Sequence, residues 1–101
     1  SADNAEVQNV NIIIDAKKAK ETTAKDSTGK ILGYRIILSS HIIIKDYLTD
    51  QEILNHNFSD SSTYKVQDQY SETLKLENKL VENLINQTYQ ELIIKLSENI
   101  L

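Results

Sequence analysis

The chain has 101 residues, a formal net charge of −4 at neutral pH, and no Cys, Met, Trp or Pro. This length predicts one domain, and the absence of Cys excludes disulfides, thiolate metal sites and thiol nucleophiles. The longest apolar runs are three residues, whereas a membrane-spanning helix needs about 20.

A long first strand is predicted directly after a polar N-terminus. Residues 1–8 are polar, and we expect them to be frayed, which leaves residues 9–101 as one domain. Beyond them apolar and polar residues alternate, and the polar pattern continues as far as Ala24. A period of two with β-branched residues is typical of a strand. One face of this strand carries Val10, Ile12, Ile14 and Ala16.

A hairpin and a second strand follow. Residues 26–29 read Asp-Ser-Thr-Gly, which predicts a turn because Asp and Ser bond to the local backbone and Gly tolerates positive φ. The opposite face of the second strand is polar except for Ile37 and Ile43, so we expect that face to be partly covered too. The apolar face of this strand carries Tyr34, Ile36, Leu38, Ile42 and Ile44.

The third strand is expected to be shorter. After a second turn at residues 47–51, Leu54, His56 and Phe58 share one face of a strand over roughly residues 52–59. The run Ser-Asp-Ser-Ser at residues 59–62 breaks this alternation, so we expect the strand to end there. Residues 63–66 then form a short extended segment.

A long helix closes the chain. From Asp68 to Leu101 there is no Gly and no Pro. Asp68 or Ser71 supplies an N-cap, and Glu72 lies where the helix dipole favours an anion. Leu76 and Ile94 fall on the side of the helix away from its apolar stripe. We expect this stripe to pack on the sheet through Leu74, Val81, Ile85, Leu92 and Leu96.

Together these elements predict an α+β domain. Its core is a three-stranded, mainly antiparallel β-meander with one long C-terminal helix packed on it. A helix about 10 Å across covers at most one face of three strands spaced about 4.8 Å apart. Because an apolar face and a strand edge stay exposed, we expect this chain to form a homo-oligomer.

The sequence shows no catalytic apparatus. His41 and His56 are its only imidazoles; they lie on adjacent predicted strands, but without the further ligands that a zinc site needs. No Ser lies in a nucleophile elbow, and the acidic residues are scattered. A pI near 5.1 with dispersed Tyr residues argues against nucleic-acid binding. We therefore predict that the chain is not an enzyme and has no cofactor and no metal site.

Positive charge gathers in the first half of the chain. Residues 1–45 carry a net charge of +2, from seven Lys/Arg and five Asp/Glu, and the remainder carries −6, from four Lys and ten Asp/Glu. Two interpretations are open: a solvated strand end, or an edge that contacts an anionic partner. The residues concerned are Lys17, Lys18, Lys20 and Lys25.

The order of several segments is informative. A strand ends in Lys-Lys-Ala-Lys-Glu at residues 17–21, and the helix ends in Leu-Ile-Ile-Lys-Leu at residues 92–96. Between them lie Ser-Thr-Tyr at 62–64 and Asp-Gln-Tyr at 68–70. In this order and spacing, residues 9–101 resemble the C-terminal two-thirds of the LPS-assembly lipoprotein family, LptE. The steps at 62–64 and 68–70 are the best matches.

This resemblance implies a non-enzymatic lipoprotein at the periplasmic face of the outer membrane. Such a protein would plug the lumen of the LptD β-barrel, help that barrel to assemble, and contact lipopolysaccharide. Our candidates for the lipopolysaccharide contact are Lys17, Lys18, Lys20 and Lys25. Family members begin with a lipid-bearing Cys, a strand and a helix, which residues 1–8 do not supply. The alternative function is a homo-oligomeric scaffold or adaptor domain with no lipid ligand.

Overall fold

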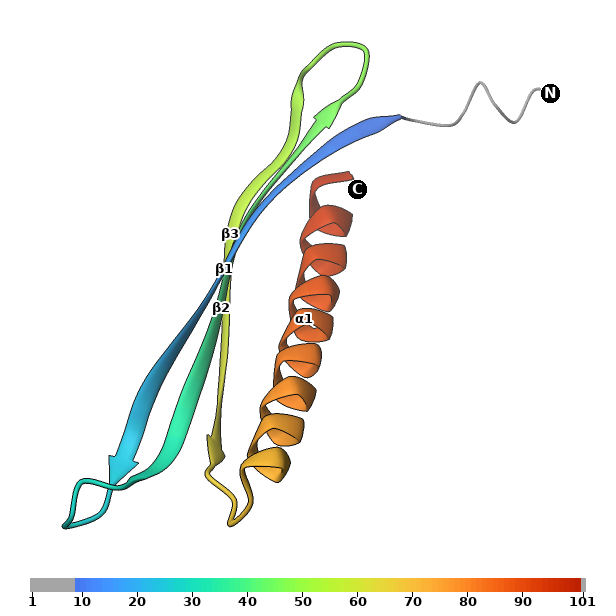
Figure 1. Ribbon diagram of the computed structural model, residues 1–101. Coiled ribbons are helices and arrows are strands. Elements are labelled where there is room, and N and C mark those ends of the chain that lie inside the picture. Colours follow the sequence, from blue (N-terminus) through green and yellow to red (C-terminus); the bar gives the residue numbers. More distant parts are fainter. Residues whose placement is uncertain (1–8, 101) are drawn as a thin grey trace.

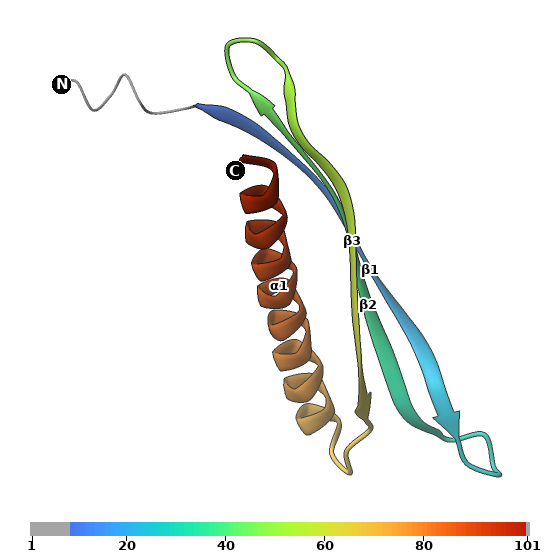
Figure 2. The ribbon, with the colours of Figure 1, turned by 180° about the vertical axis from the view of Figure 1, so that it is seen from behind.

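The computed structural model describes residues 9–100, and its elements follow the predicted order. The three strands form one antiparallel sheet in the order β1-β2-β3, and α1 runs along one face of it (Figure 1; Figure 2, from behind). This confirms the α+β meander with a long C-terminal helix, whereas the prediction for residues 1–8 lies outside the described residues. The elements are β1 (Val10–Lys25), β2 (Ile31–Asp46), β3 (Glu52–Lys65) and α1 (Tyr70–Ile100).

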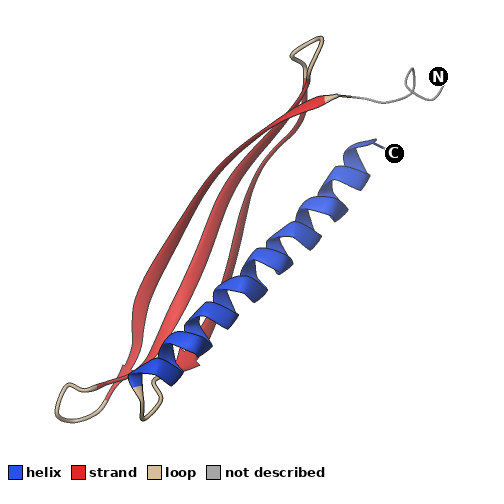
Figure 3. Ribbon diagram, turned by 45° about the vertical axis from the view of Figure 1, so that its right-hand side comes forward, coloured by secondary structure: helices blue, strands red, loops and turns tan. Residues whose placement is uncertain are grey.

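The molecule is a rod. Its extents are 66 × 24 × 19 Å and its radius of gyration is 19.0 Å, where a compact chain of this length has about 13 Å. The shape follows from the element lengths, because strands of 14 to 16 residues and a helix of 31 residues all run along one axis (Figure 3).

Both hairpin turns are held by an aspartate. Asp26 Oδ1 accepts hydrogen bonds from the backbone N–H groups of Thr28 and Lys30, each at 2.9 Å, and Gly29 has φ of 88°. In the second turn, Asp46 Oδ1 accepts from the backbone N–H groups of Leu48 and Thr49. Both turns lie where the sequence predicts them.

The prediction that the third strand ends near Ser59 is wrong, because β3 continues without a break to Lys65. The alternation of buried positions continues through the polar run, with Phe58, Asp60 and Tyr64 each less than 7% exposed. A buried Asp is tolerated here because helix side chains bond to it. The polar run is therefore the exposed face of a strand whose other face lies under α1.

α1 covers β3 and part of β2. One buried cluster joins Ile36 and Tyr64 of the sheet to Leu84 of the helix, which is 2% exposed. The second cluster lies nearer the C-terminal end of α1, where Leu92 and Leu96 pack against four buried sheet residues. These four are Ile42, Ile44, Leu54 and Phe58.

The helix is rotated relative to the predicted orientation. Ile85 is 53% exposed and Leu74 is 38% exposed, so the prediction that they pack on the sheet is wrong. The line that faces the sheet instead runs through Leu84 and through two polar residues outside the predicted stripe, Thr73 and Glu77. Val81, Leu92 and Leu96 are partly buried, because they pack against the edges of the two buried clusters between the helix and the sheet. The sheet-facing line includes Thr73, Glu77, Leu84 and Thr88.

β1 is the uncovered part of the sheet. Every residue of this strand is exposed, including Ile12 at 54% and Ile14 at 61%. Of the elements in residues 9–100, none lies on the opposite face of the sheet, which we call the open face. The prediction that this face is also covered is therefore wrong for the described part of the chain, and Ile37 and Ile43 are only half-buried there.

Candidate functional site

The four predicted lysines do not form one patch. Lys17 lies opposite Ser39 of β2, on the open face, whereas Lys18 lies opposite Leu38 on the face that carries α1. Lys20 shares the helix-bearing face with Lys18, one pleat further along. Lys25 ends β1, beyond two irregularities in the strand register. An anion that contacts one face of the sheet therefore meets Lys17 or Lys18, but not both.

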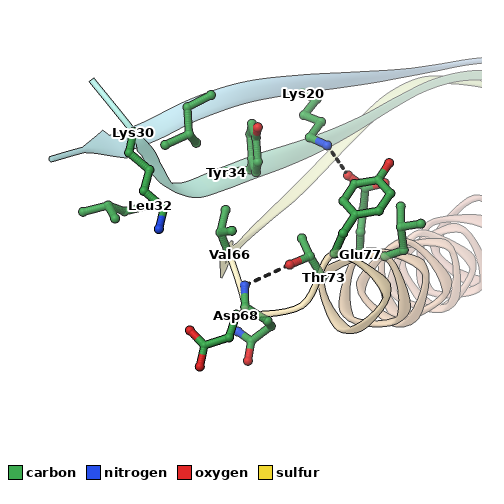
Figure 4. A pocket seen from close by; sticks show the side chains of 12 residues that line it. Lys20, Lys30, Leu32, Tyr34, Val66, Asp68, Thr73 and Glu77 are labelled. Carbon is green, nitrogen blue, oxygen red and sulfur yellow. Dashed lines mark hydrogen bonds and ion pairs between the residues drawn. The ribbon is translucent and has the colours of Figure 1, made fainter. Parts of the chain in front are cut away.

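Lys20 already takes part in a polar contact between the sheet and the helix. Its Nζ lies 2.7 Å from Glu77 Oε1 of α1 and 4.2 Å from the centroid of the Tyr34 ring. The hydroxyl of Tyr64, on β3, donates a hydrogen bond to the same Glu77 carboxylate. Figure 4 shows Lys20 and Glu77 meeting between the sheet and the helix. The contact ties β1, β3 and α1 together near the start of the helix.

The ionisation of these groups is consistent with a stable ion pair. The hydrogen bond from Lys20, followed by that from Tyr64, lowers the pKa of the Glu77 carboxyl. The hydrogen bond to Glu77 likewise raises the pKa of Lys20. Burial, followed by the bond to Glu77, raises the pKa of the Tyr64 hydroxyl. The ammonium of Lys20 is thus charged at neutral pH, but its carboxylate partner competes with any added anion.

A hollow of about 500 Å³ opens beside this contact, between the β1–β2 hairpin and the start of α1. Its wall combines apolar and polar side chains, with Lys30 and Asp68 among the charged ones (Figure 4). The apolar lining is Ile31, Leu32, Tyr34, Val66 and Leu74.

The open face of the sheet is rich in uncharged hydrogen-bonding groups, a feature that our sequence reading did not recognise. Five alternate positions of β3 on this face carry only Asn, Ser or Thr. The sequence carries this signal as an Asn, Ser or Thr at every second position from residue 55 to residue 63. The five residues are Asn55, Asn57, Ser59, Ser61 and Thr63.

A buried polar cluster anchors the middle of α1 to β3. Asp60, 5% exposed, accepts hydrogen bonds from the Thr88 hydroxyl at 2.7 Å and from Gln87 Nε2 at 2.9 Å. A hydrogen bond to Asp60, with burial second, raises the pKa of the neighbouring Glu91 carboxyl. The partners of Asp60 all lie on one turn of α1, so this cluster fixes the rotation of the helix.

The two histidines do not share a site. His41 lies on the open face, where its Nε2 is 2.6 Å from Asn55 Oδ1. His56 lies on the helix-bearing face, with its ring 4.7 Å from that of Phe58. Across residues 9–100, no three His, Asp or Glu side chains come together in a group suited to a metal ion.

Comparison with protein-family models finds no family that matches this chain, and comparison with curated proteins finds no match either. No helix among the described residues is both long enough and apolar enough to cross a membrane.

Proposed function

We propose that this chain is a non-enzymatic subunit of outer-membrane lipopolysaccharide assembly, which plugs and helps to assemble a β-barrel of the LptD type and contacts lipopolysaccharide. In this proposal the chain acts at the periplasmic face of the outer membrane. The order of segments that resembles the LptE family suggests this function. The observation that carries it is an uncharged row of Asn, Ser and Thr side chains, contributed by β3 to the open face of a rod-shaped molecule.

The dimensions of the rod suit the lumen of a large barrel. Barrels of about 22 strands hold a plug in their lumen. Such a barrel, with strands about 4.8 Å apart and tilted by about 40°, is about 44 Å across. The rod's cross-section of 24 × 19 Å leaves about 10 Å on each side for the inward side chains of the barrel.

The open face suits the wall of such a lumen. The interior of a membrane β-barrel is polar, and a polar wall needs hydrogen-bonding partners when water is displaced from it. The Asn, Ser and Thr side chains of β3 supply donors and acceptors without burying charge. A face made for an apolar core would carry Val, Ile or Leu at these positions instead.

Lys17, Lys18 and Lys25 are the remaining candidates for contact with lipid phosphates, since Lys20 is paired with Glu77. In the proposal, Lys17 and Lys18 contact phosphate from opposite faces of β1, and Lys25 does so at the end of the strand. Salt screens such contacts between exposed charges. Binding of lipopolysaccharide is thus expected to be strongest at low ionic strength.

Binding of the chain to a detergent-solubilised LptD-type barrel tests the plug. Two carboxylates placed on the open face by Ser59→Glu and Ser61→Glu should weaken this binding by at least about 10-fold, because each would be buried without a partner. The control carries the same two charges at the β2–β3 turn, by Leu48→Glu and Gln51→Glu, where the residues are exposed.

Absence of binding by the unmodified chain, or equal binding by the open-face variant and the control, would count against the plug. A separate assay with lipopolysaccharide vesicles and neutral phospholipid vesicles tests the ligand. Charge reversal at Lys17 and Lys18 should weaken binding to the former, most strongly at low salt.

A homo-oligomeric scaffold is the second candidate, and one observation favours it. The strand β1 is exposed along its whole length and carries three consecutive Ile residues. The first part of this edge, residues 10–14, carries no charged side chain, and uncovered, uncharged strand edges tend to associate.

A further inference from the structure

One edge of β1 has no neighbouring strand among residues 9–100, because β2 lies along its other edge; we call it the free edge. The backbone O of Asn9 accepts a hydrogen bond from the N–H of Tyr47, so the odd-numbered residues of β1 direct their backbone groups to β2. In an antiparallel ladder the alternate residues direct theirs the other way. The even-numbered residues therefore present N–H and C=O groups at the free edge. In the first half of the strand these residues are Val10, Ile12, Ile14 and Ala16.

The first half of β1 has a self-complementary pattern. Residues 10–16 read Val-Asn-Ile-Ile-Ile-Asp-Ala, and the order of apolar and polar residues is the same in both directions from Ile13. An antiparallel copy centred on Ile13 therefore places apolar opposite apolar and polar opposite polar at every position, which is how cross-strand pairs stabilise a sheet. The pairs are Ile13 with itself, Ile12 with Ile14, Asn11 with Asp15 and Val10 with Ala16.

Other registers that bring the even-numbered residues of two copies together contain mismatches. Centres at residues 15, 17 and 18 set like charges directly opposite each other, which is destabilising. Centres at residues 12 and 14 set Ile13 opposite a polar residue, and a centre at residue 16 sets two Ile opposite two Lys. The register centred on Ile13 is free of both kinds of mismatch.

We propose that β1 of one chain pairs along its free edge with β1 of a second copy, antiparallel and centred on Ile13, so that two three-stranded sheets join into one sheet of six strands. A two-fold axis perpendicular to the sheet produces this arrangement and leaves both α1 helices on the same face. The inference gives the homo-oligomeric candidate function an interface; it rests on that candidate and not on the role in lipopolysaccharide assembly.

The contact adds backbone hydrogen bonds and covers apolar side chains. The four even-numbered residues of each chain form about eight N–H···O=C bonds. Ile12 and Ile14 of both chains form one apolar strip, which continues the buried cluster under the C-terminal half of α1. The two copies of Lys17 lie about 27 Å apart along the strands, which is farther than exposed charges act at physiological salt. Because the paired stretch is short, we expect a weak dimer, with a dissociation constant on the order of 100 µM.

Sedimentation velocity of the chain between about 5 and 500 µM measures this association, without barrel or lipid. Ile13→Lys should raise the dissociation constant at least about 10-fold, because the two-fold axis sets the two lysines opposite each other. The matched control is Ile94→Lys on α1, where the side chain is 60% exposed against 50% for Ile13. This control should change the constant less than about 3-fold. Circular dichroism verifies that each variant is folded.

Disulfide cross-linking tests the register, since the chain has no Cys of its own. In this dimer two Cys residues at position 13 form a directly opposite pair without backbone hydrogen bonds, with Cα atoms about 4.5 Å apart, within the range of a disulfide. Copper–phenanthroline should therefore link Ile13→Cys chains at least about 10-fold faster than Ala19→Cys chains. Position 19 lies on the same face of β1 but about 40 Å from its copy in this register.

The pairing of Asn11 with Asp15 can be tested in both directions. Asn11→Lys sets a cation opposite Asp15 and should lower the dissociation constant about 3-fold, whereas Asn11→Asp should raise it about 3-fold. Both changes should shrink at high salt. Equal effects of the two substitutions would contradict the proposed pairing.

The remaining outcomes separate this contact from its alternatives. A chain that stays monomeric at about 500 µM would overturn the proposal and the homo-oligomeric candidate together. A dimer that Ile85→Lys disrupts and Ile13→Lys does not would overturn the edge contact alone, and faster cross-linking at position 16 or 19 than at position 13 would overturn the register. A monomer whose thiol at position 13 is protected by an LptD-type barrel would assign the free edge to the barrel instead.

Discussion

The two outer strands of the sheet, β1 and β3, have similar lengths and pair with the same central strand, yet they have opposite surroundings. β1 is exposed at all 16 positions, whereas β3 buries Leu54, Phe58, Asp60 and Tyr64. Apolar content does not explain this difference, because β1 holds three consecutive Ile residues and β3 is mostly polar. The short connection between β3 and α1 explains it, because α1 begins five residues after β3 ends and returns along that strand.

Polar contacts then fix the helix over β3. Thr73 accepts a hydrogen bond from the backbone N–H of Gln67, and Thr88 donates one to Asp60. Glu77 lies between them and binds Tyr64 of β3 as well as Lys20 of β1. These three helix residues lie on one line and face the sheet. The covered strand is thus the one that offers partners for polar helix side chains, and the apolar stripe of α1 points elsewhere.

The largest expected contrast between the two strands comes from truncating an apolar side chain on each. Phe58→Ala on β3 should lower the free energy of unfolding by about 3–5 kcal/mol, because it leaves a cavity under α1. Ile14→Ala on β1 should cost less than about 1 kcal/mol in the dilute chain, since the side chain is already exposed. Urea denaturation at about 1 µM measures both, and equal losses would mean that β1 is covered.

The same contrast applies to two neighbouring positions of α1. Leu84→Ala should cost about 2–5 kcal/mol, because Leu84 packs on Ile36 and Tyr64. Ile85→Ala should cost less than about 1 kcal/mol under the same dilute conditions. A larger loss for Ile85 than for Leu84 would show that the helix is rotated as the sequence pattern indicates.

The anchor to β3 can be tested through Thr88. Thr88→Val keeps the shape of the side chain but removes the hydrogen bond to the buried Asp60, so it should cost about 1–3 kcal/mol. Thr28→Val, in the exposed first hairpin turn, serves as a control for the substitution and should cost less. If both variants unfold at the urea midpoint of the parent, the Asp60 contact does not hold the helix.

The smallest effect is expected from the anchor that reaches β1. Glu77 has a lowered pKa, so its contribution is present above the ordinary carboxyl pKa of 4.5 and is lost as pH falls through the lower folded value. Glu77→Gln should cost less than about 1 kcal/mol at pH 7, because Lys20 is partly exposed, and should flatten the loss of stability in acid.

Glu91 should show the opposite pH dependence, because its pKa is raised beside Asp60. Glu91→Gln should therefore remove a loss of stability that develops as pH rises above 4.5. Unfolding followed from pH 3 to 7 separates the two, and parallel profiles would contradict the assignment.

Local patterns in the sequence predict much of this fold. The Asp-to-Gly turn at residues 26–29 and the alternation in the second strand both lead to the observed hairpin and to the observed faces of β2. The length of β3 could not be predicted, because a buried Asp at position 60 interrupts the pattern until its partner Thr88 is known. The rotation of α1 could not be predicted for a similar reason. Its sheet-facing residues include the polar Thr73 and Glu77, whereas the prediction assumed that only apolar residues face the sheet.

The candidate site was less predictable than the fold. Four lysines close in sequence suggested one basic edge, but strand alternation sends Lys17 and Lys18 to opposite faces, and Lys20 meets a glutamate that lies 57 residues further along the chain. The polar open face was visible as alternate Asn, Ser and Thr residues in β3. Its length could not be recognised because the strand was expected to end early.

Thiol labelling at two neighbouring positions tests the central claim most directly, namely that helix cover ends between β2 and β1. Ala16 and Ser40 pair across these strands, and Ser40 is 7% exposed whereas Ala16 is exposed. Because the chain has no Cys, Ala16→Cys and Ser40→Cys each introduce a single thiol, and each replaces a residue close to Cys in size. We predict that in the dilute chain a maleimide reacts with position 16 at least about 100-fold faster than with position 40, and that the reaction at position 16 alone slows as the chain concentration rises. Equal protection of both positions in the dilute chain would contradict this account.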